Sequence, residues 1–277
     1  MNKLEETLTL HNGVEIPVIG FGTWLIKESD APEIVLNALK AGYRHIDTAE
    51  AYGNEHGVGL AIRNSGIPRE DIFLQTKVIA ECKEYDWAVR QIEESFKKLN
   101  VDYIDLMIIH CPTPWKEYRS GKRYDQGNLE VWKALSEYYK AGKIKSIGVS
   151  NFDIEDIENI IKHSDIKPMV NQIPVYISNV NKELVKYCED NDIIVEAYSP
   201  LGHGKILNHP IIKEVADKYH VSTAQLCVRY TLQLGMVSLP KASSIEHIKN
   251  NADVDFNISD EDMEILDKIE YIPIFDY

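Results

Sequence analysis

The chain has 277 residues, of which 44% are hydrophobic, and this length suits either one large domain or two of ordinary size. Its 30 basic and 44 acidic side chains give a formal net charge of −14, which argues against duplex nucleic acid or an anionic membrane surface as the main partner. The four cysteines form no CxxC pair, no apolar run approaches the length of a membrane span, and the first residues lack the basic and apolar regions of a signal peptide, so we expect a cytoplasmic protein.

Residues 7–18 contain two short alternating runs around Asn12-Gly13, and an Asn-Gly pair between such runs is typical of a β-hairpin. From residue 19 onward, strand-like and helix-like segments alternate along the chain. The predicted strands are 19–22, 43–47, 72–77, 104–109, 144–149, 169–173, 193–197 and 237–239. The predicted helices are 31–41, 55–64, 86–99, 129–141, 153–162, 181–190, 209–219, 222–234, 245–251 and 260–269.

Eight near-continuous apolar strands that alternate with helices predict a parallel sheet covered by helices, and eight such units favour closure into a (β/α)8 barrel. We therefore expect an α/β fold, a TIM barrel with an N-terminal β-hairpin at its bottom and extra helices near the C-terminus. No linker divides the sequence, so residues 1–277 are predicted to form a single domain. The longest polar gap, 113–128, is predicted to be a loop, either a lid or a solvated loop, and it contains three aromatic residues: Trp115, Tyr118 and Tyr124.

Ionisable side chains lie at the ends of three successive predicted strands. Asp47 ends the second strand, Lys77 ends the third, His110 follows the fourth, and Tyr52 comes five residues after Asp47. Because the C-terminal ends of barrel strands meet on one face, where active sites lie, these four side chains are expected to meet there. Taken one at a time, these residues have ordinary structural interpretations: Asp47 and Lys77 as a buried ion pair, Tyr52 as a surface aromatic and His110 as a capped strand end. The ordered set of four instead indicates a function.

This ordered set, with GFGTW at residues 20–24 and GVSNF at residues 148–152, resembles the aldo-keto reductases from about residue 8 to about residue 269. Within that family it is similar to the short bacterial branch of diketogluconate and glyoxal reductases. The resemblance implies an NAD(P)H-dependent oxidoreductase that reduces aldehydes and ketones by hydride transfer, with NADPH as the cofactor and NADH as the alternative. It also implies a catalytic tetrad: Asp47, Tyr52, Lys77 and His110.

Hydride addition to a carbonyl creates an alkoxide, which a positioned acid must protonate. Tyr52 is the candidate acid, and an ammonium roughly 4 Å from its phenol, at an effective dielectric of about 20, would contribute on the order of 4 kcal/mol, or about 3 pKa units. Burial of the phenol opposes this effect, so the expected net lowering of the Tyr52 pKa is smaller. Asp47 is expected to keep Lys77 charged, and His110 to donate a hydrogen bond to the carbonyl oxygen.

The sequence lacks a Rossmann fingerprint, because Gly20-x-Gly22 is too short and Gly57-x-Gly59 lies within a predicted helix. A barrel can instead hold phosphate with the loops after its seventh and eighth strands, which here are 198–204 and 240–244. The resemblance implies a set of cofactor-binding residues: Thr23, Asp47, Ser150, Asn151, Gln172, Tyr198, Ser199, Leu201, Lys241, Ser243, Ser244, His247 and Asn251.

The family has an arginine at the position of His247, three residues after the expected helix N-cap Ser244. A guanidinium is permanently charged and can bind a phosphate through two hydrogen bonds, and a histidine has neither property. Because Lys241 remains, NADPH is still the expected cofactor, with a weaker preference over NADH.

The resemblance also implies a set of substrate-binding residues: Trp24, Trp87, His110 and Cys111. Cys111 stands where many relatives have tryptophan, which indicates a roomier pocket beside His110. We expect a small-molecule carbonyl substrate, no metal and a monomer. Four basic side chains in the 113–128 loop raise the hypothesis that it attracts anionic substrates: Lys116, Arg119, Lys122 and Arg123. His203 and His209 are interpreted as solvent-exposed surface.

Three other functions remain open from the sequence. His45-x-Asp47 suggests a metal-dependent hydrolase, although the other strand ends supply poor metal ligands. A Schiff-base aldolase would use Lys77, and a carboxylate beside that lysine counts against it. An NADPH-binding regulatory subunit of the same fold, with little turnover, is the non-enzymatic alternative.

Overall fold

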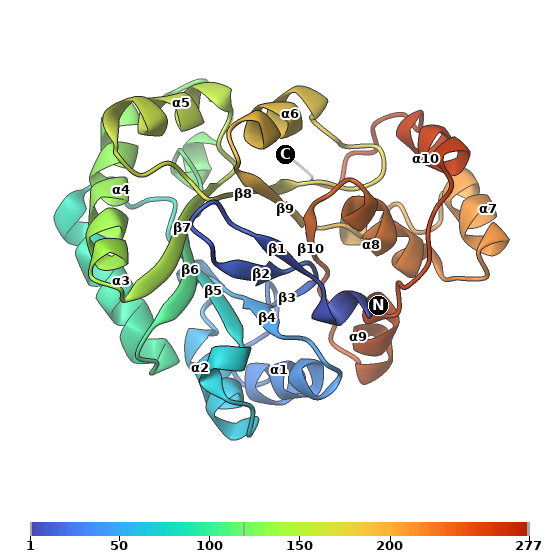
Figure 1. Ribbon diagram of the computed structural model, residues 1–277, viewed down its shortest axis with the longest axis horizontal. Helices are drawn as coiled ribbons and strands as arrows, with labels where there is room; N and C mark the ends of the chain where they lie inside the picture. Colours follow the sequence, from blue (N-terminus) through green and yellow to red (C-terminus); the bar gives the residue numbers. More distant parts are fainter. Residues whose placement is uncertain (1, 119, 276–277) are drawn as a thin grey trace.

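The computed structural model describes residues 2–118 and 120–275. Eight parallel strands follow one another around a ring in sequence order, and a bridge between Ile19 and Ser238 joins the last strand to the first. Figure 1 shows this ring with the helices around its outside, which confirms the predicted (β/α)8 barrel. The strands are β3 Gly20–Gly22, β4 His45–Asp47, β5 Phe73–Val78, β6 Ile104–Ile109, β7 Ile144–Ser150, β8 Val170–Pro174, β9 Ile194–Tyr198 and β10 Val237–Leu239.

Amphipathic helices cover the ring because each presents one apolar stripe to the strands. In α3, for example, Ala88, Ile92 and Leu99 share the buried face, and Asn100 ends the helix in the left-handed region at φ +51°. The α-helices are α1 Ala31–Lys40, α2 Glu55–Asn64, α3 Tyr85–Leu99, α4 Asp125–Lys140, α5 Ile154–His163, α6 Lys182–Asp190, α7 Pro210–Lys218, α8 Thr223–Gln233, α9 Ile245–Ala252 and α10 Asp260–Asp267. None of the helices in the described ranges is long and apolar enough to cross a membrane.

The predicted hairpin is confirmed as β1 Thr7–Thr9 and β2 Glu15–Pro17, paired antiparallel, with Gly13 at φ +88° in the turn. Figure 1 shows it lying across the end of the barrel where the strands begin. Its tip is tied to the barrel because Asn12 Nδ2 donates to the Lys145 carbonyl oxygen at 3.0 Å. The hairpin therefore leaves only the opposite end of the barrel, where the strands finish, open for a central site.

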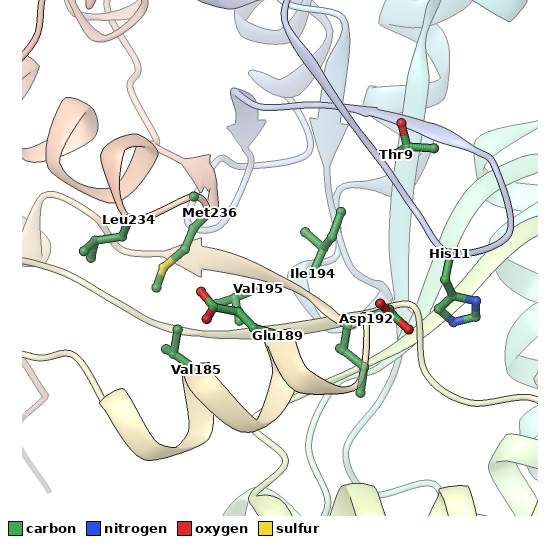
Figure 2. Close-up of a pocket in the computed structure, with 11 residues that line it drawn as sticks. Thr9, His11, Val185, Glu189, Asp192, Ile194, Val195, Leu234 and Met236 are labelled. Carbon is green, nitrogen blue, oxygen red and sulfur yellow. The ribbon is translucent and has the colours of Figure 1, made fainter.

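A surface cavity of about 550 Å³ lies beside the hairpin, between α6 and the starts of β9 and β10. Figure 2 shows His11 on the hairpin, with Glu189 and Asp192 on the opposite wall. Among the described residues no group of three His, Cys, Asp or Glu side chains is placed to hold a metal ion. This end of the barrel carries none of the strand-end residues singled out by the sequence.

The predicted loop 113–128 is shorter than expected, because α4 begins at Asp125 and a 3-10 turn occupies Trp115–Glu117. Gly127, which falls within the predicted loop, lies inside α4 at a close approach to Lys83. A Cβ on Gly127 would lie 2.7 Å from the Cβ of Lys83, so the glycine serves packing and does not break the helix.

Candidate active site

Lys77 and Asp47 meet at the open end of the barrel. In the β4–β5 register Asp47 lies opposite Gln75, so Lys77, two residues further along β5, projects above this pair on the same inner face. Lys77 Nζ donates to Asp47 Oδ1 at 2.6 Å, to the Thr48 carbonyl oxygen at 2.8 Å and to the Tyr52 hydroxyl at 3.3 Å. All three ammonium hydrogens are engaged in a position with no solvent exposure.

Tyr52 is carried by a 3-10 turn, Glu50–Tyr52, which Gly53 ends in the left-handed region at φ +67°. Lys98 on α3 donates to Glu50 at 2.9 Å and so fixes the outer end of this turn. The phenol therefore reaches Lys77 from a short, anchored segment.

The buried side chain of Asn54 holds the same segment by hydrogen bonds to its neighbours. The sequence did not identify this residue. Its side-chain amide donates to the carbonyl oxygens of Thr23 and Ile26, both at 2.9 Å, and its oxygen accepts from the Thr48 hydroxyl at 2.7 Å. Asparagine directly after a turn glycine was the only available signal, and it does not distinguish this role from an ordinary turn residue.

Burial changes the titration of three of these groups. Burial raises the pKa of Tyr52 more than Lys77 lowers it, so the expected net lowering was wrong. Burial lowers the pKa of Lys77, but the neighbouring Asp47 and the Tyr52 contact outweigh it and the net pKa is raised. Burial, and then the charge of Lys77, hold the pKa of His110 well below its usual range, so its imidazole is neutral.

His110 stands between two aromatic rings. Its ring centroid lies 5.6 Å from that of Tyr52 and 5.3 Å from that of Trp115, both at steep angles. Nδ1 is buried without a hydrogen-bond partner in the described part of the chain, which leaves Nε2 as the nitrogen able to serve a ligand. The Trp115 contact brings the 113–124 loop to the edge of the site.

A cavity of about 850 Å³ opens above these side chains. Eleven predicted site residues line it: Trp24, Asp47, Tyr52, His110, Ser150, Asn151, Gln172, Tyr198, Ser199, Leu201 and Lys241. Three further lining residues belong to the loop 198–204, which was expected to hold phosphate: Pro200, His203 and Gly204. The remaining lining residues were not predicted to belong to the site: Gly22, Leu25, Ala51, Trp115, Leu207, Leu239 and Phe275. Trp115 had been noted only as part of a potential lid.

An amide-rich patch lies beside the tetrad at the ends of β7 and β8. Ser150 Oγ donates to the Gln172 carbonyl oxygen at 2.8 Å, and Asn151 Nδ2 donates to the His110 carbonyl oxygen at 3.0 Å. The Tyr198 hydroxyl donates to Asn151 Oδ1 at 2.8 Å. The patch presents donors and acceptors of the kind that a carboxamide needs.

The loop after β9 folds over the cavity wall. Ser199 and His203 both have left-handed backbone angles, φ +54° and +52°, and Ser199 Oγ lies 2.9 Å from His203 Nε2. The His203 ring packs against Trp24 at 5.2 Å and against Phe275 at 4.9 Å between centroids. His203 is exposed, as expected, and its side chain also lines the cavity, whereas only the backbone of its loop was expected to take part in the site.

A phosphate-compatible donor set lies next to Lys241, which lines the cavity. Lys241 Nζ lies 2.8 Å from Ser243 Oγ, and Ser244 caps α9 by accepting from the His247 backbone N–H at 3.2 Å, which confirms the expected N-cap. Together with the free N–H groups of the helix start, these side chains fit the phosphate of a dinucleotide. His247 is exposed on α9, whereas Asn251 is 97% buried in it.

Eight predicted site residues do not line the cavity. One is Lys77, which is enclosed beneath it, and the other seven are Thr23, Trp87, Cys111, Ser243, Ser244, His247 and Asn251. The Thr23 hydroxyl is buried and donates to the Asp47 carbonyl oxygen at 3.0 Å. Trp87 lies in α3 and packs against the core from outside the barrel. Cys111 is fully buried, since the residue after His110 points to the opposite side, and its Sγ lies 3.9 Å from Thr113 Oγ1. The expected pocket walls at Trp87 and Cys111 are instead supplied by Trp115 and Phe275.

The aldo/keto reductase family model matches residues 18–271. A glyoxal reductase of Bacillus subtilis is 41% identical over 268 residues, which cover 96% of this chain and 93% of the relative. The crystal structure of an aldo/keto reductase from Brucella melitensis has a TM-score of 0.88 at 40% identity and covers 95% of this chain and 98% of that chain. The crystal structure of a Bombyx mori aldo-keto reductase in complex with NADP has a TM-score of 0.87 at 33% identity and covers 98% of this chain and 95% of that chain. This chain therefore belongs to the aldo/keto reductase family and is an NAD(P)H-dependent oxidoreductase.

Proposed function

We propose that this protein reduces small aldehydes and ketones to alcohols with NADPH, and that Tyr52 is the proton donor. The observation that carries the proposal is the position of Lys77 Nζ, 2.6 Å from Asp47 Oδ1 and 3.3 Å from the Tyr52 hydroxyl, closed to solvent and beside a neutral His110. An acid whose conjugate base is stabilised by an adjacent ammonium is what carbonyl reduction requires.

The bound cofactor supplies a hydride to the carbonyl carbon. His110 donates a hydrogen bond to the carbonyl oxygen, which orients the substrate, and Tyr52 transfers its proton to the same oxygen as the alcohol forms. Lys77 stabilises the phenolate that is left, and Asp47 keeps the buried ammonium protonated. The raised pKa of Tyr52 keeps the phenol protonated at neutral pH and ready to act as an acid.

The donor sets along the cavity support one direction for the cofactor. Ser150, Asn151 and Gln172 would hold the carboxamide, and Tyr198 would contact the nicotinamide ring. Residues of the loop after β9 would hold the diphosphate: Ser199 and Leu201. Residues around the start of α9 would hold the adenosine phosphate end: Lys241, Ser243, Ser244, His247 and Asn251. Thr23 acts indirectly in this arrangement, since its hydroxyl holds the backbone of Asp47.

The named relatives support the substrate class and cofactor. One of them is a glyoxal reductase, and a structural neighbour was crystallised with NADP. Trp24, Trp115 and His110 line a cavity whose walls are mostly apolar with one polar focus at the tetrad, which suits a small carbonyl compound. We propose that residues 1–277 act as one barrel domain and as a monomer.

The substitution Tyr52→Phe tests the proposal. It should abolish NADPH-dependent reduction, followed by the loss of NADPH absorbance, while NADPH still quenches the protein fluorescence. Tyr271→Phe, at a tyrosine that is 55% exposed, is the matched control and should keep wild-type turnover. Near wild-type turnover by Tyr52→Phe would remove Tyr52 from the mechanism.

The same assay separates the alternatives. A regulatory subunit would bind NADPH without turnover of any aldehyde, dicarbonyl or keto acid. The hydrolase hypothesis depended on His45 as a ligand, but the His45 ring lies beneath the tetrad with Nε2 only 2.8 Å from Gln75 Oε1, so it is already engaged.

A further inference from the structure

A group of polar side chains fills the barrel interior directly beneath the tetrad. His45, Gln75, Gln172 and Glu196 are all at most 2% exposed, in a core that barrels usually fill with branched apolar residues. Burial of polar groups is unfavourable unless each finds partners. The presence of four polar side chains in this core therefore indicates a role other than packing.

Glu196 holds Gln172 in one orientation. Glu196 Oε2 accepts from Gln75 Nε2 at 2.7 Å and from Gln172 Nε2 at 2.9 Å. Gln172 Nε2 also donates to Asp47 Oδ1 at 3.1 Å. An amide nitrogen has two hydrogens, so both are used, and the Gln172 amide oxygen is the end that remains for a ligand.

The second oxygen of Glu196 has a different environment. Glu196 Oε1 is buried and accepts no hydrogen bond from the described residues, and His45 Nε2 lies 3.7 Å from it. The titratable groups facing Glu196 are His45 and Asp47 from β4, Lys77 from β5 and Tyr52 from the 3-10 turn that follows β4. Because Asp47 and Lys77 already offset each other, an ionised Glu196 would be a buried charge without a partner of its own.

We propose that Glu196 is a positioning residue of the reductase site. Glu196 orients the Gln172 amide so that its oxygen faces the nicotinamide carboxamide. By gaining or losing one proton, Glu196 also changes the charge beneath the nicotinamide site. This inference rests on the proposed function, in which Gln172 contacts the carboxamide.

Titration near neutrality makes this control measurable. Burial, followed by the charge of Asp47, raises the pKa of Glu196 to about 7. Below that pH the carboxyl is neutral, and above it a negative charge lies beneath the site. The oxidised nicotinamide ring is positively charged and the reduced ring is neutral, so ionised Glu196 favours NADP+ over NADPH.

The test measures the dissociation constants of NADP+ and NADPH by fluorescence quenching at about pH 6 and about pH 9. In the wild-type protein the preference for NADP+ over NADPH should increase about tenfold with rising pH. Glu196→Gln retains an acceptor for both glutamines and has no charge to gain, so its preference should stay constant. Glu55→Gln, at another buried carboxyl with a raised pKa, is the matched control and should behave like wild type.

A second variant tests the positioning role. Glu196→Met removes the acceptor, which frees the Gln172 amide to rotate, so NADPH should bind about tenfold more weakly. Binding of 2′,5′-ADP, which lacks the nicotinamide, should not change, and this readout also reports whether the variant folds. Wild-type NADPH affinity in Glu196→Met would overturn the positioning role.

Infrared spectroscopy gives a readout that needs no cofactor. In the difference between the infrared spectra of the wild-type protein and Glu196→Gln, the carbonyl stretch of one protonated carboxylic acid should be present at low pH and should disappear with rising pH. A wild-type preference that does not change with pH, or one that changes equally in Glu196→Gln, would overturn the charge control. Failure of the wild-type protein to bind either cofactor would instead reject the proposed function.

Discussion

Lys77 Nζ lies 2.6 Å from Asp47 Oδ1, with the lysine side chain fully enclosed and the aspartate side chain 6% exposed. Neither charge has another oppositely charged partner among the ion pairs of the described chain, so each depends on the other. Removal of one partner from a buried pair leaves an uncompensated charge, which is far more unfavourable than removal of both.

Asp47→Asn and Lys77→Met should therefore each lower the free energy of unfolding by about 3–5 kcal/mol. The double substitution should be less destabilising than the sum of the two, because it leaves no unpaired charge. Urea denaturation of the four proteins measures this coupling. Additive effects would mean that the two charges do not interact.

Glu196 should make stability depend on pH. Its pKa is raised from 4.5 to about 7 in the folded protein, so between these values the folded protein keeps a proton that the unfolded chain has released. The free energy of unfolding contributed by this group therefore falls as pH rises through this window, by about 3 kcal/mol at 1.36 kcal/mol per pKa unit, and stays constant above it. Relative to Glu196→Gln, the wild-type protein should lose this amount between about pH 4.5 and about pH 7.5, as measured by urea denaturation. A difference that does not vary with pH would place the Glu196 pKa near its ordinary value.

His247→Arg should increase the preference for NADPH over NADH. His247 is exposed on α9, three residues after Ser244. An arginine at this position adds a permanent positive charge and can donate two hydrogen bonds to one phosphate. Solvent screening limits the gain, so the ratio of kcat/KM for NADPH over NADH should rise about tenfold, or roughly 1.4 kcal/mol. His220→Arg, at an exposed histidine in the turn after α7, controls for the added charge and should leave the ratio unchanged. An equal increase in both variants would indicate a general charge effect.

Arg123 should hold in place the loop that brings Trp115 to the site. Its guanidinium lies within 3.6 Å of four carboxylates: Asp125, Asp153, Glu155 and Asp156. Arg123→Gln should therefore make the 113–124 loop more susceptible to proteolysis and raise KM for the carbonyl substrate by roughly threefold to tenfold, with NADPH affinity unchanged. Lys122→Gln is the matched control, since its exposed pair with Glu117 contributes about 0–1 kcal/mol and its loss should have little effect. A wild-type KM in Arg123→Gln would show that the ion pairs of Arg123 do not contribute to substrate binding.

These ion pairs also bear on the hypothesis that the loop attracts anionic substrates. Arg123 and Lys122 are already paired with carboxylates, so they do not form a free positive patch. Arg119 lies outside the described residues. The steering hypothesis therefore stays a prediction, and it now depends on fewer charges than the sequence suggested.

The order of apolar and polar segments by itself determined the barrel and the meeting of Asp47, Tyr52, Lys77 and His110. Eight strand–helix units close in only a few ways, and closure in sequence order brings the ends of neighbouring strands together whatever the details of packing. The cap at Ser244 was also predictable, because an N-cap depends on residues that are adjacent in the chain.

Only the tertiary structure decided which distant side chains touch and how deeply they are buried. From the sequence, Glu196 is only a polar residue in a strand, until barrel closure places it against Gln75, four strands away, and Gln172, one strand away. Phe275 replaces Trp87 at the pocket because the C-terminal segment crosses the open end of the barrel while α3 stays outside it. The pKa of Tyr52 is raised because burial outweighs the nearby Lys77 ammonium, and both effects depend on three-dimensional distances that no spacing in the chain specifies.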